Sequence, residues 1–294
     1  MATTWWLEVF SLNDENVVQN LFLEIEMAAK KFETNYSRFL DTSYISKLNR
    51  EKKLFDFPVE LFQMLRFAEE IRVKSLNNFN VGVGGVLEDL GYDKDYSFNT
   101  KDSLNQEILD FKRSSFLALN QTEIQILPSF KIDLGGLGKG WLIDKIATFF
   151  KQNQIEFFSI NGGGDIYCTS NFDTPVEFIL ENPVDVTQSI GKIQIMNQGI
   201  ACSASNRRQW LDKKTNQTHH HLINLEEKQS ENEKIAVFTS GSNALLADVA
   251  ATTIFVAKPE QVVEIAQNLA VEFSIIWSDL SYVNSLNYAG ELFC

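Results

Sequence analysis

The sequence predicts an α/β or α+β protein in which mixed sheets pack against helices, as one compact unit of two lobes. Three observations support this fold class. Strand-like runs and amphipathic helix-like runs follow one another along the whole chain. Glycine-rich turns interrupt the chain three times, next to strand-like runs. No Pro/Ser-rich linker, low-complexity tract or internal repeat divides the 294 residues, so we expect residues 1–294 to form a single domain.

The first half of the chain is predicted to begin with a strand, continue with helices and end in short strands. Trp5–Phe10 has the apolar character of a strand. One helix is expected from a cap at Asn13 or Asp14 to about Phe32, and another from Pro58 to about Lys74. Between them, a short turn of helix is capped by Thr42 or Ser43. Alternating patterns predict strands at Phe116–Leu119, Ile124–Leu127 and Lys131–Leu134.

The second half is predicted to be richer in strands. A helix follows Leu134 and ends near Gln152, Ser242 is a suitable cap for a later helix, and Pro259 begins another. The expected strands are Phe157–Ile160, Ile166–Cys168, Val176–Leu180, Lys192–Met196, Ile200–Ser203, His219–Leu225, Ile235–Phe238 and Phe273–Trp277.

Composition limits the classes of partner. Hydrophobic residues make up 44% of the chain and charged residues 22%, which is ordinary for a globular protein with a sizeable core. The net charge of −13 argues against nucleic acid or an anionic membrane as a partner. An anionic ligand then needs local positive charge or a metal ion. No run of about 18 apolar residues predicts a membrane span.

The cysteines and the N-terminus bear on the compartment. Cys168, Cys202 and Cys294 form neither a disulfide framework nor a metal-type pair. The N-terminal residues have no basic region followed by an apolar run, as a signal peptide would. These features favour a cytoplasmic location, and an exported mature form stays open.

The glycine-rich stretch Lys131–Asp144 is a candidate phosphate site. A strand-like run ends at Leu134, and glycines then precede a helix-like pattern, at Gly135, Gly136, Gly138 and Gly140. A strand, a glycine turn and a helix can bring backbone N–H groups close to a phosphate, and Lys139 can meet the same anion. The spacing matches neither the Walker lysine loop nor the dinucleotide-binding fingerprint. A tightly packed turn without a ligand is the alternative.

Asp248 and Thr252 are four residues apart on a predicted helix, so their side chains project from one face. Both offer hard oxygen ligands that suit Mg²⁺. Alanines at 244, 247, 250 and 251 would let another group approach this helix closely. The alternative is ordinary, with the threonine bonded back to a carbonyl and the aspartate in solvent.

Three consecutive histidines, His219 to His221, lie in a predicted strand, with His219 and His221 on one side and His220 on the other. A zinc site would need a further ligand, whereas a single histidine can carry a proton near neutral pH. A histidine-rich surface strand is the alternative. Arg207 and Arg208 can bind a phosphate or pair with acidic residues, and we favour pairing.

Taken together, these segments resemble the ApbE-like FAD:protein FMN transferase family, in the family's order. The family's Asp-Leu-Gly-Gly-Ile-Ala-Lys-Gly-x-x-x-Asp is similar to Asp133–Asp144, and its Asn-x-Gly-Gly-Asp to Asn161–Asp165. Its Ala-Asp-Ala-x-Ala-Thr is similar to Ala247–Thr252. Shorter similarities are found at Met1–Thr4, Ser37–Phe39, Ser46–Asn49, Phe79–Gly84, Ala201–Ala204 and His221–Asn224.

The resemblance implies a T-fold-like arrangement of two lobes around a central FAD cleft. It implies that FAD is cleaved at its pyrophosphate, that FMN moves to a Ser or Thr hydroxyl of an acceptor flavoprotein, and that AMP is released. The acceptor would carry an Asp-x-Ser/Thr-Gly-Ala/Ser-Ser/Thr-type motif. Mg²⁺ would be the cofactor, held by Asp248, Thr252 and the Gly138 carbonyl, and His221 and Asp248 would be catalytic. The FAD-binding residues implied are Thr3, Asn80, Asp133, Gly135, Gly136, Lys139, Asp144, Asn161, Gly163, Gly164, Asp165, Ser203 and His221.

The chain departs from the family pattern at a few positions. Asn224 and Asn80 each replace an aspartate, and Cys202–Ala204 replaces a Thr-Ser-Gly. Two other functions therefore stay open. Water could replace the acceptor hydroxyl, which would make the protein an FAD pyrophosphatase, or the protein could bind FAD without catalysis. A glycine-rich α/β protein that binds no flavin is the remaining alternative.

Overall fold

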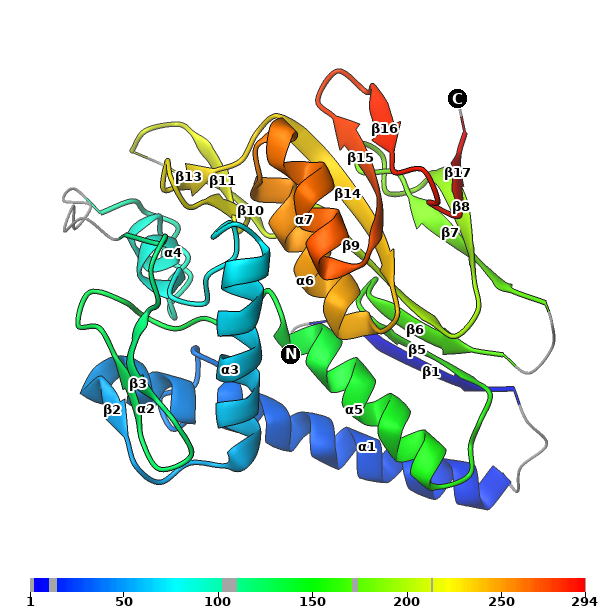
Figure 1. Cartoon of the computed structure of the whole chain (residues 1–294), viewed down its shortest axis with the longest axis horizontal. Helices are drawn as coiled ribbons and strands as arrows, with labels where there is room; N and C mark the ends of the chain where they lie inside the picture. Colours follow the sequence, from blue (N-terminus) through cyan, green and yellow to red (C-terminus); the bar gives the residue numbers. More distant parts are fainter. Residues whose placement is uncertain (1–2, 11–14, 102–109, 171–173, 213, 294) are drawn as a thin grey trace.

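A large antiparallel sheet is the centre of the fold in the computed structural model (Figure 1), which describes residues 3–10, 15–101, 110–170, 174–212 and 214–293. Its strand order is β1-β5-β6-β9-β14-β15-β16. The strands are β1 (Trp5–Val9), β5 (Phe158–Gly162), β6 (Ile166–Thr169), β9 (Gln198–Ala204), β14 (Lys234–Gly241), β15 (Glu272–Trp277) and β16 (Tyr282–Asn284). Each neighbouring pair is antiparallel, which is the α+β form of the predicted fold class.

Helices cover one face of this sheet (Figure 1). They are α5 (Gly138–Gln152), α6 (Ala244–Val256) and α7 (Val262–Leu269), with a short 3₁₀ turn at Pro259–Gln261, while α1 (Glu15–Tyr36) lies along α5. The small residues of α6 let it approach α5 closely, and a Cβ at Gly140 would come within 2.6 Å of the Leu245 Cα. Gly140 is therefore required where the two helices meet.

A second, smaller sheet covers the opposite face of the large sheet. Its strand order is β17-β8-β7, from β7 (Val176–Glu181), β8 (Ser189–Ile195) and β17 (Gly290–Leu292). Side chains of both sheets share one apolar core, in which Leu180 and Ile193 of the small sheet pack with Ile200 and Phe238 of the large one. The two sheets thus form a sandwich, and the C-terminal strand β17 completes it (Figure 1).

The remaining elements form the second lobe, on the left of Figure 1. They are α2 (Tyr44–Glu51), α3 (Val59–Lys74), α4 (Gly84–Asp89) and the sheet β2-β4-β3, from β2 (Lys53–Leu54), β3 (Phe116–Leu119) and β4 (Ile124–Ile126). Two small hairpins border it, formed by β10 (Gln209–Leu211) with β11 (Thr218–His220) and by β12 (Ile223–Asn224) with β13 (Gln229–Ser230). One apolar core joins this lobe to α1, α5 and α6.

Most of the predicted elements are present, with three corrections. Lys131–Leu134 forms only an isolated parallel bridge, between Lys131 and Val83, and not a strand. On its other edge the Asn49 side chain bonds both the N–H and the carbonyl of Ile132, at 2.6 and 2.9 Å. Asn243, and not Ser242, caps α6 by accepting the Leu246 N–H at 2.8 Å.

The predicted strand His219–Leu225 is interrupted after His220, so its alternation does not extend to His221. The cap residues expected at Asn13 and Asp14 lie outside the described residues. Ser43 caps α2 as expected, with its hydroxyl accepting the Ser46 N–H at 3.0 Å. Within the described residues, no helix combines the length and hydrophobicity that a membrane crossing requires.

Candidate active site

A pocket of about 690 Å³ contains most of the residues that the sequence singled out. Both lobes and the N-terminal segment contribute to its wall. The predicted residues that line it are Thr3, Asn80, Asp133, Gly135, Gly136, Lys139, Asn161, Gly163, Gly164, Ser203, His221, Asp248 and Thr252. Residues far apart in sequence thus meet around one cavity, as a shared ligand would require.

Lys139 is the positive centre of a buried charge cluster. It projects from the first turn of α5, forms an ion pair with Asp165 and lies 3.9 Å from Oδ1 of Asp248. Burial disfavours a charged lysine, but the two carboxylates outweigh it and raise the pKa of Lys139. Burial raises the pKa of Asp165, against the attraction of Lys139, and the nearby Asp248 adds to the rise.

The residues around Asp248 fit a hard metal ion. Asp248 is only 4% exposed, and its Oδ2 accepts the Gly140 N–H at 2.9 Å. Thr252 is one turn further along α6, and its hydroxyl oxygen lies 3.3 Å from that of Ser203. Carboxylate and hydroxyl oxygens such as these suit Mg²⁺. Among the described residues, no group of three or more His, Cys, Asp or Glu side chains is placed to hold a metal.

Gly138, the other predicted metal ligand, is the first residue of α5 and does not line the pocket. Its role as a carbonyl ligand stays a prediction. Asp165 also lies behind the lining and reaches the pocket through Lys139.

The structure separates the three histidines. The His219 ring lies tilted beside Trp210, with ring centroids 6.0 Å apart, and His220 lies within hydrogen-bond distance of the Glu231 carbonyl, at 2.5 Å from Nε2. Only His221 lines the pocket, at the break between β11 and β12. Its Nδ1 is buried without a hydrogen-bond partner among the described residues.

Burial, followed by the charge of Arg208, lowers the pKa of His221 well below its ordinary value of 6.5. The ring is therefore neutral near neutral pH and can accept a proton. Arg207 and Arg208 both line the pocket, and Arg207 also pairs with Glu181 through bonds of 2.5 and 2.7 Å, as the sequence favoured for it.

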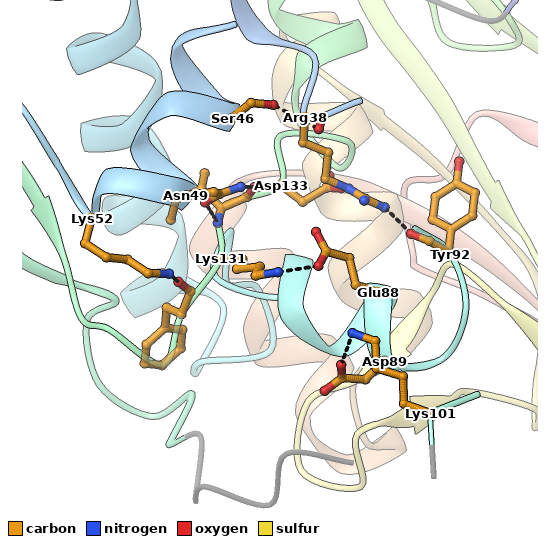
Figure 2. Close-up of polar contacts among 12 residues, drawn as sticks. Arg38, Ser46, Asn49, Lys52, Glu88, Asp89, Tyr92, Lys101, Lys131 and Asp133 are labelled. Atoms are coloured by element: carbon orange, nitrogen blue, oxygen red, sulfur yellow. Dashed lines mark hydrogen bonds and ion pairs between the residues drawn. The ribbon is translucent and has the colours of Figure 1, made fainter. Parts of the chain in front are cut away.

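Asp133 is held by an arginine that the sequence did not predict as a site residue. Figure 2 shows the Arg38 guanidinium between Asp133 and Tyr92: it pairs with the carboxylate and donates to the Tyr92 carbonyl at 2.8 Å. The guanidinium also lies 4.2 Å from the centre of the Phe39 ring. Phe39, Tyr92 and Asp133 all line the pocket, so Arg38 supports this wall from behind.

Asp144 does not line the pocket. Its carboxylate accepts the N–H groups of Ala244 and Leu245, at 2.9 and 3.1 Å, and so binds the N-terminus of α6. Burial raises the pKa of Asp144 to about 6 against these two bonds. The structure thus gives Asp144 a structural contact that positions the helix of Asp248 and Thr252.

Two asparagines shape loops of the pocket. The Asn161 Oδ1 accepts the Gly164 N–H at 2.9 Å and closes a turn in which Gly163 and Gly164 have φ of +76° and +102°. Thr3 packs directly on Gly163, where a Cβ would collide with it. The Asn80 Oδ1 accepts the Gly82 N–H at 2.8 Å, which fixes the loop before α4.

Asn224, which replaces an aspartate of the family pattern, closes the turn between β12 and β13. Its Oδ1 accepts the N–H groups of Glu226 and Glu227, at 3.0 and 3.2 Å. An aspartate oxygen can accept the same two bonds, so these turn contacts do not depend on the replacement.

The fold and the pocket together define a two-lobed α+β protein whose cavity carries charged side chains, among them Lys139 and Arg208, that suit a phosphate-containing ligand. The chain belongs to the ApbE family, whose family model matches residues 1–276, and this confirms the family and the fold class predicted from the sequence. It is 24% identical over 285 residues to the FAD:protein FMN transferase of Buchnera aphidicola, covering 92% of this chain and 82% of that protein. It is 22% identical over 202 residues to the FAD:protein FMN transferase of Klebsiella pneumoniae, covering 66% and 61%.

Solved structures show the same fold. The ApbE protein of Thermotoga maritima is similar with a TM-score of 0.85 at 18% identity, over 97% of this chain and 94% of that chain. The flavin transferase ApbE of Vibrio cholerae is similar with a TM-score of 0.77 at 19% identity, over 97% and 94%.

Proposed function

We propose that this protein is a Mg²⁺-dependent FAD:protein FMN transferase. It transfers FMN from FAD to a Ser or Thr hydroxyl of an acceptor flavoprotein, through a phosphoester bond, and releases AMP. The names of the two curated relatives support the reaction. The observation that carries the proposal is the meeting of Lys139, Asp248, Thr252 and His221 around one pocket.

Lys139 and Arg208 provide positive charge where the pyrophosphate of FAD would lie. The protein has a net charge of −13, so an anionic substrate needs such local compensation. Mg²⁺, held by Asp248 and Thr252, with the Gly138 carbonyl as a further candidate ligand, would neutralise charge on the phosphate oxygens. In phosphoryl transfer, catalysis depends mainly on positioning and charge neutralisation, which are what these residues offer.

His221 receives the proton of the acceptor hydroxyl. The hydroxyl oxygen forms a bond to the FMN phosphorus, the bond from that phosphorus to the bridging oxygen breaks, and AMP leaves with the electron pair. A buried, neutral imidazole with an unpartnered Nδ1 suits this role. The acceptor segment would carry the Asp-x-Ser/Thr-Gly-Ala/Ser-Ser/Thr-type motif of the family.

Analysis of all products from one incubation tests the proposal. The protein is incubated with FAD and Mg²⁺, with and without a motif-bearing acceptor, and AMP, FMN and acceptor fluorescence in a gel are measured. We expect AMP and a fluorescent acceptor only when all components are present. AMP and free FMN without the acceptor would identify an FAD pyrophosphatase. Intact FAD that copurifies and never turns over would identify a non-catalytic binder.

A further inference from the structure

The pocket extends between the two sheets of the sandwich. This part of the pocket, here called the inter-sheet arm, is lined by Leu180, Ile193, Cys202, Phe238 and Tyr288. All five also belong to, or pack against, the apolar core shared by the two sheets. The arm is continuous with the charged centre of the pocket, because these five residues and Lys139 line the same cavity. A ligand at Lys139 can therefore reach into it.

The hydroxyl of Tyr288 is a buried polar group in this apolar arm. It has no hydrogen-bond partner among the described residues. Burial, with the neighbouring Cys202 as a smaller cause, raises the pKa of Tyr288, so the hydroxyl stays protonated and can donate as well as accept. A second buried oxygen without a partner in the described residues, Oδ1 of Asn206, lines the same pocket. Nδ1 of His221 is a third such atom in this cavity. Buried polar groups are normally paired, so three exceptions in one cavity point to a ligand.

The C-terminal segment holds Tyr288 in a fixed position. The Tyr288 ring packs directly against Gly290, where a Cβ would collide with it. Gly290 itself pairs with Ile193 in the small sheet. Glu272 of β15 accepts a hydrogen bond from the Ser285 hydroxyl at 2.5 Å and another from the Asn287 N–H at 3.3 Å, which fixes the preceding turn. Neither the ring nor its backbone is free to turn away from the arm.

We propose that Tyr288 is a substrate-binding residue whose hydroxyl forms a hydrogen bond with a substrate group in the inter-sheet arm. The proposal rests on the proposed function. The apolar lining and the single hydroxyl fit a mainly apolar part of a ligand that carries an amide-type N–H or a carbonyl group. Two sources share this chemistry, the ring edges of FAD and the peptide backbone of the acceptor. Tyr288 lies beyond residues 1–276, which the family model matches, so it is a feature of the C-terminal segment of this chain.

Tyr288→Phe removes the hydroxyl and keeps the ring against Gly290. An unpartnered buried hydroxyl destabilises the free protein, so the variant should melt at the wild-type temperature or slightly above. Tyr282→Phe is the matched control, because Tyr282 lies on the adjacent strand β16 and does not line the pocket. The dissociation constant of FAD is measured by flavin fluorescence without acceptor, and the KM of the acceptor is measured at saturating FAD.

We expect Tyr288→Phe to raise either the FAD dissociation constant or the acceptor KM about threefold to tenfold, as for the loss of one hydrogen bond. A rise in the FAD dissociation constant identifies FAD as the partner of the hydroxyl. An unchanged FAD constant with a higher acceptor KM identifies the acceptor. The inference is overturned if both constants stay within about twofold of wild type, or if the loss comes with a lower melting temperature of the free protein. A wild-type protein that neither binds FAD nor modifies the acceptor would instead overturn the proposed function.

Discussion

The Lys139 ammonium lies 3.9 Å from Oδ1 of Asp248, which joins the first turn of α5 to α6. The same aspartate accepts the Gly140 N–H, and the lysine is also paired with Asp165. One positive charge thus serves two buried carboxylates. The lysine is therefore already partly neutralised before a phosphate arrives.

This charge balance predicts an order of importance for two variants. Asp248→Ala should lower the transfer rate by at least about 100-fold, because it removes the proposed metal ligand. Lys139→Ala should lower it less, by about tenfold, because Mg²⁺ would still neutralise the phosphates. Initial rates at saturating FAD and Mg²⁺ measure both. A larger loss in Lys139→Ala than in Asp248→Ala would contradict the proposed division of roles.

His221 should control the rate and the pH dependence of stability. His221→Gln should lower the transfer rate by about 10²-fold or more, with little change in FAD affinity, because it removes the proton acceptor. Since burial lowers the pKa of His221 below 6.5, the folded protein binds fewer protons than the unfolded chain as pH falls through this value. This contribution to stability is present above pH 6.5 and decreases below it.

Melting curves from pH 7.5 down to about 5 test this point. The melting temperature of the wild type should fall more steeply than that of His221→Gln. His219→Gln is a useful comparison for the rate, because His219 lies outside the pocket lining. A full rate in His221→Gln would remove this residue from the mechanism.

Asp144 should affect stability more than FAD binding. Asp144→Ala leaves the N–H groups of Ala244 and Leu245 without their acceptor and should lower the free energy of unfolding by about 1–2 kcal/mol. At temperatures where the variant is folded, its FAD dissociation constant should stay within about threefold of wild type. Chemical denaturation and flavin fluorescence give the two quantities. Unchanged stability with a large loss of FAD affinity would instead support direct cofactor binding by Asp144.

Gly140 should be intolerant of any side chain. In Gly140→Ala, the new Cβ would lie 2.6 Å from the Leu245 Cα and 2.8 Å from the Ala244 carbonyl oxygen, and backbone atoms cannot yield easily. We expect a loss of about 1–3 kcal/mol in the free energy of unfolding, and lower activity because α5 and α6 move apart. Gly85→Ala is the matched control: no atom lies within 4 Å of its Cβ position, so the free energy of unfolding should be unchanged or slightly higher.

The sequence predicted the helices and strands that have a clear apolar period, and its ordered motifs contain most of the predicted residues that line the pocket. It did not predict what depends on contacts between distant residues. Lys131–Leu134 has the pattern of a strand, but it forms a single bridge to Val83, and the Asn49 side chain bonds its other edge. Among the three adjacent histidines, the strand alternation did not single one out and the family resemblance pointed to His221. The break after His220 explains why only His221 lines the pocket.

The sequence also did not predict which distant residues pair with or pack against the site residues. Arg38 supports Asp133 across a sequence separation of 95 residues, and no local pattern connects the two. Asp144 lies in the same motif as Asp133, yet the crossing of α5 and α6 turns it toward the N-terminus of α6. Tyr288 is in a C-terminal segment whose short strands β16 and β17 the sequence did not predict, because they form by pairing with β15 and β8.

The central claim is that FMN becomes attached to an acceptor protein. Intact-mass spectrometry of a motif-bearing acceptor, incubated with this protein, FAD and Mg²⁺, measures that attachment directly. We predict a mass increase of one FMN phosphoester, at the motif Ser or Thr, that is lost on chelation of Mg²⁺ and in Asp248→Ala. An acceptor of unchanged mass, with the wild-type protein folded and FAD bound, would contradict the claim.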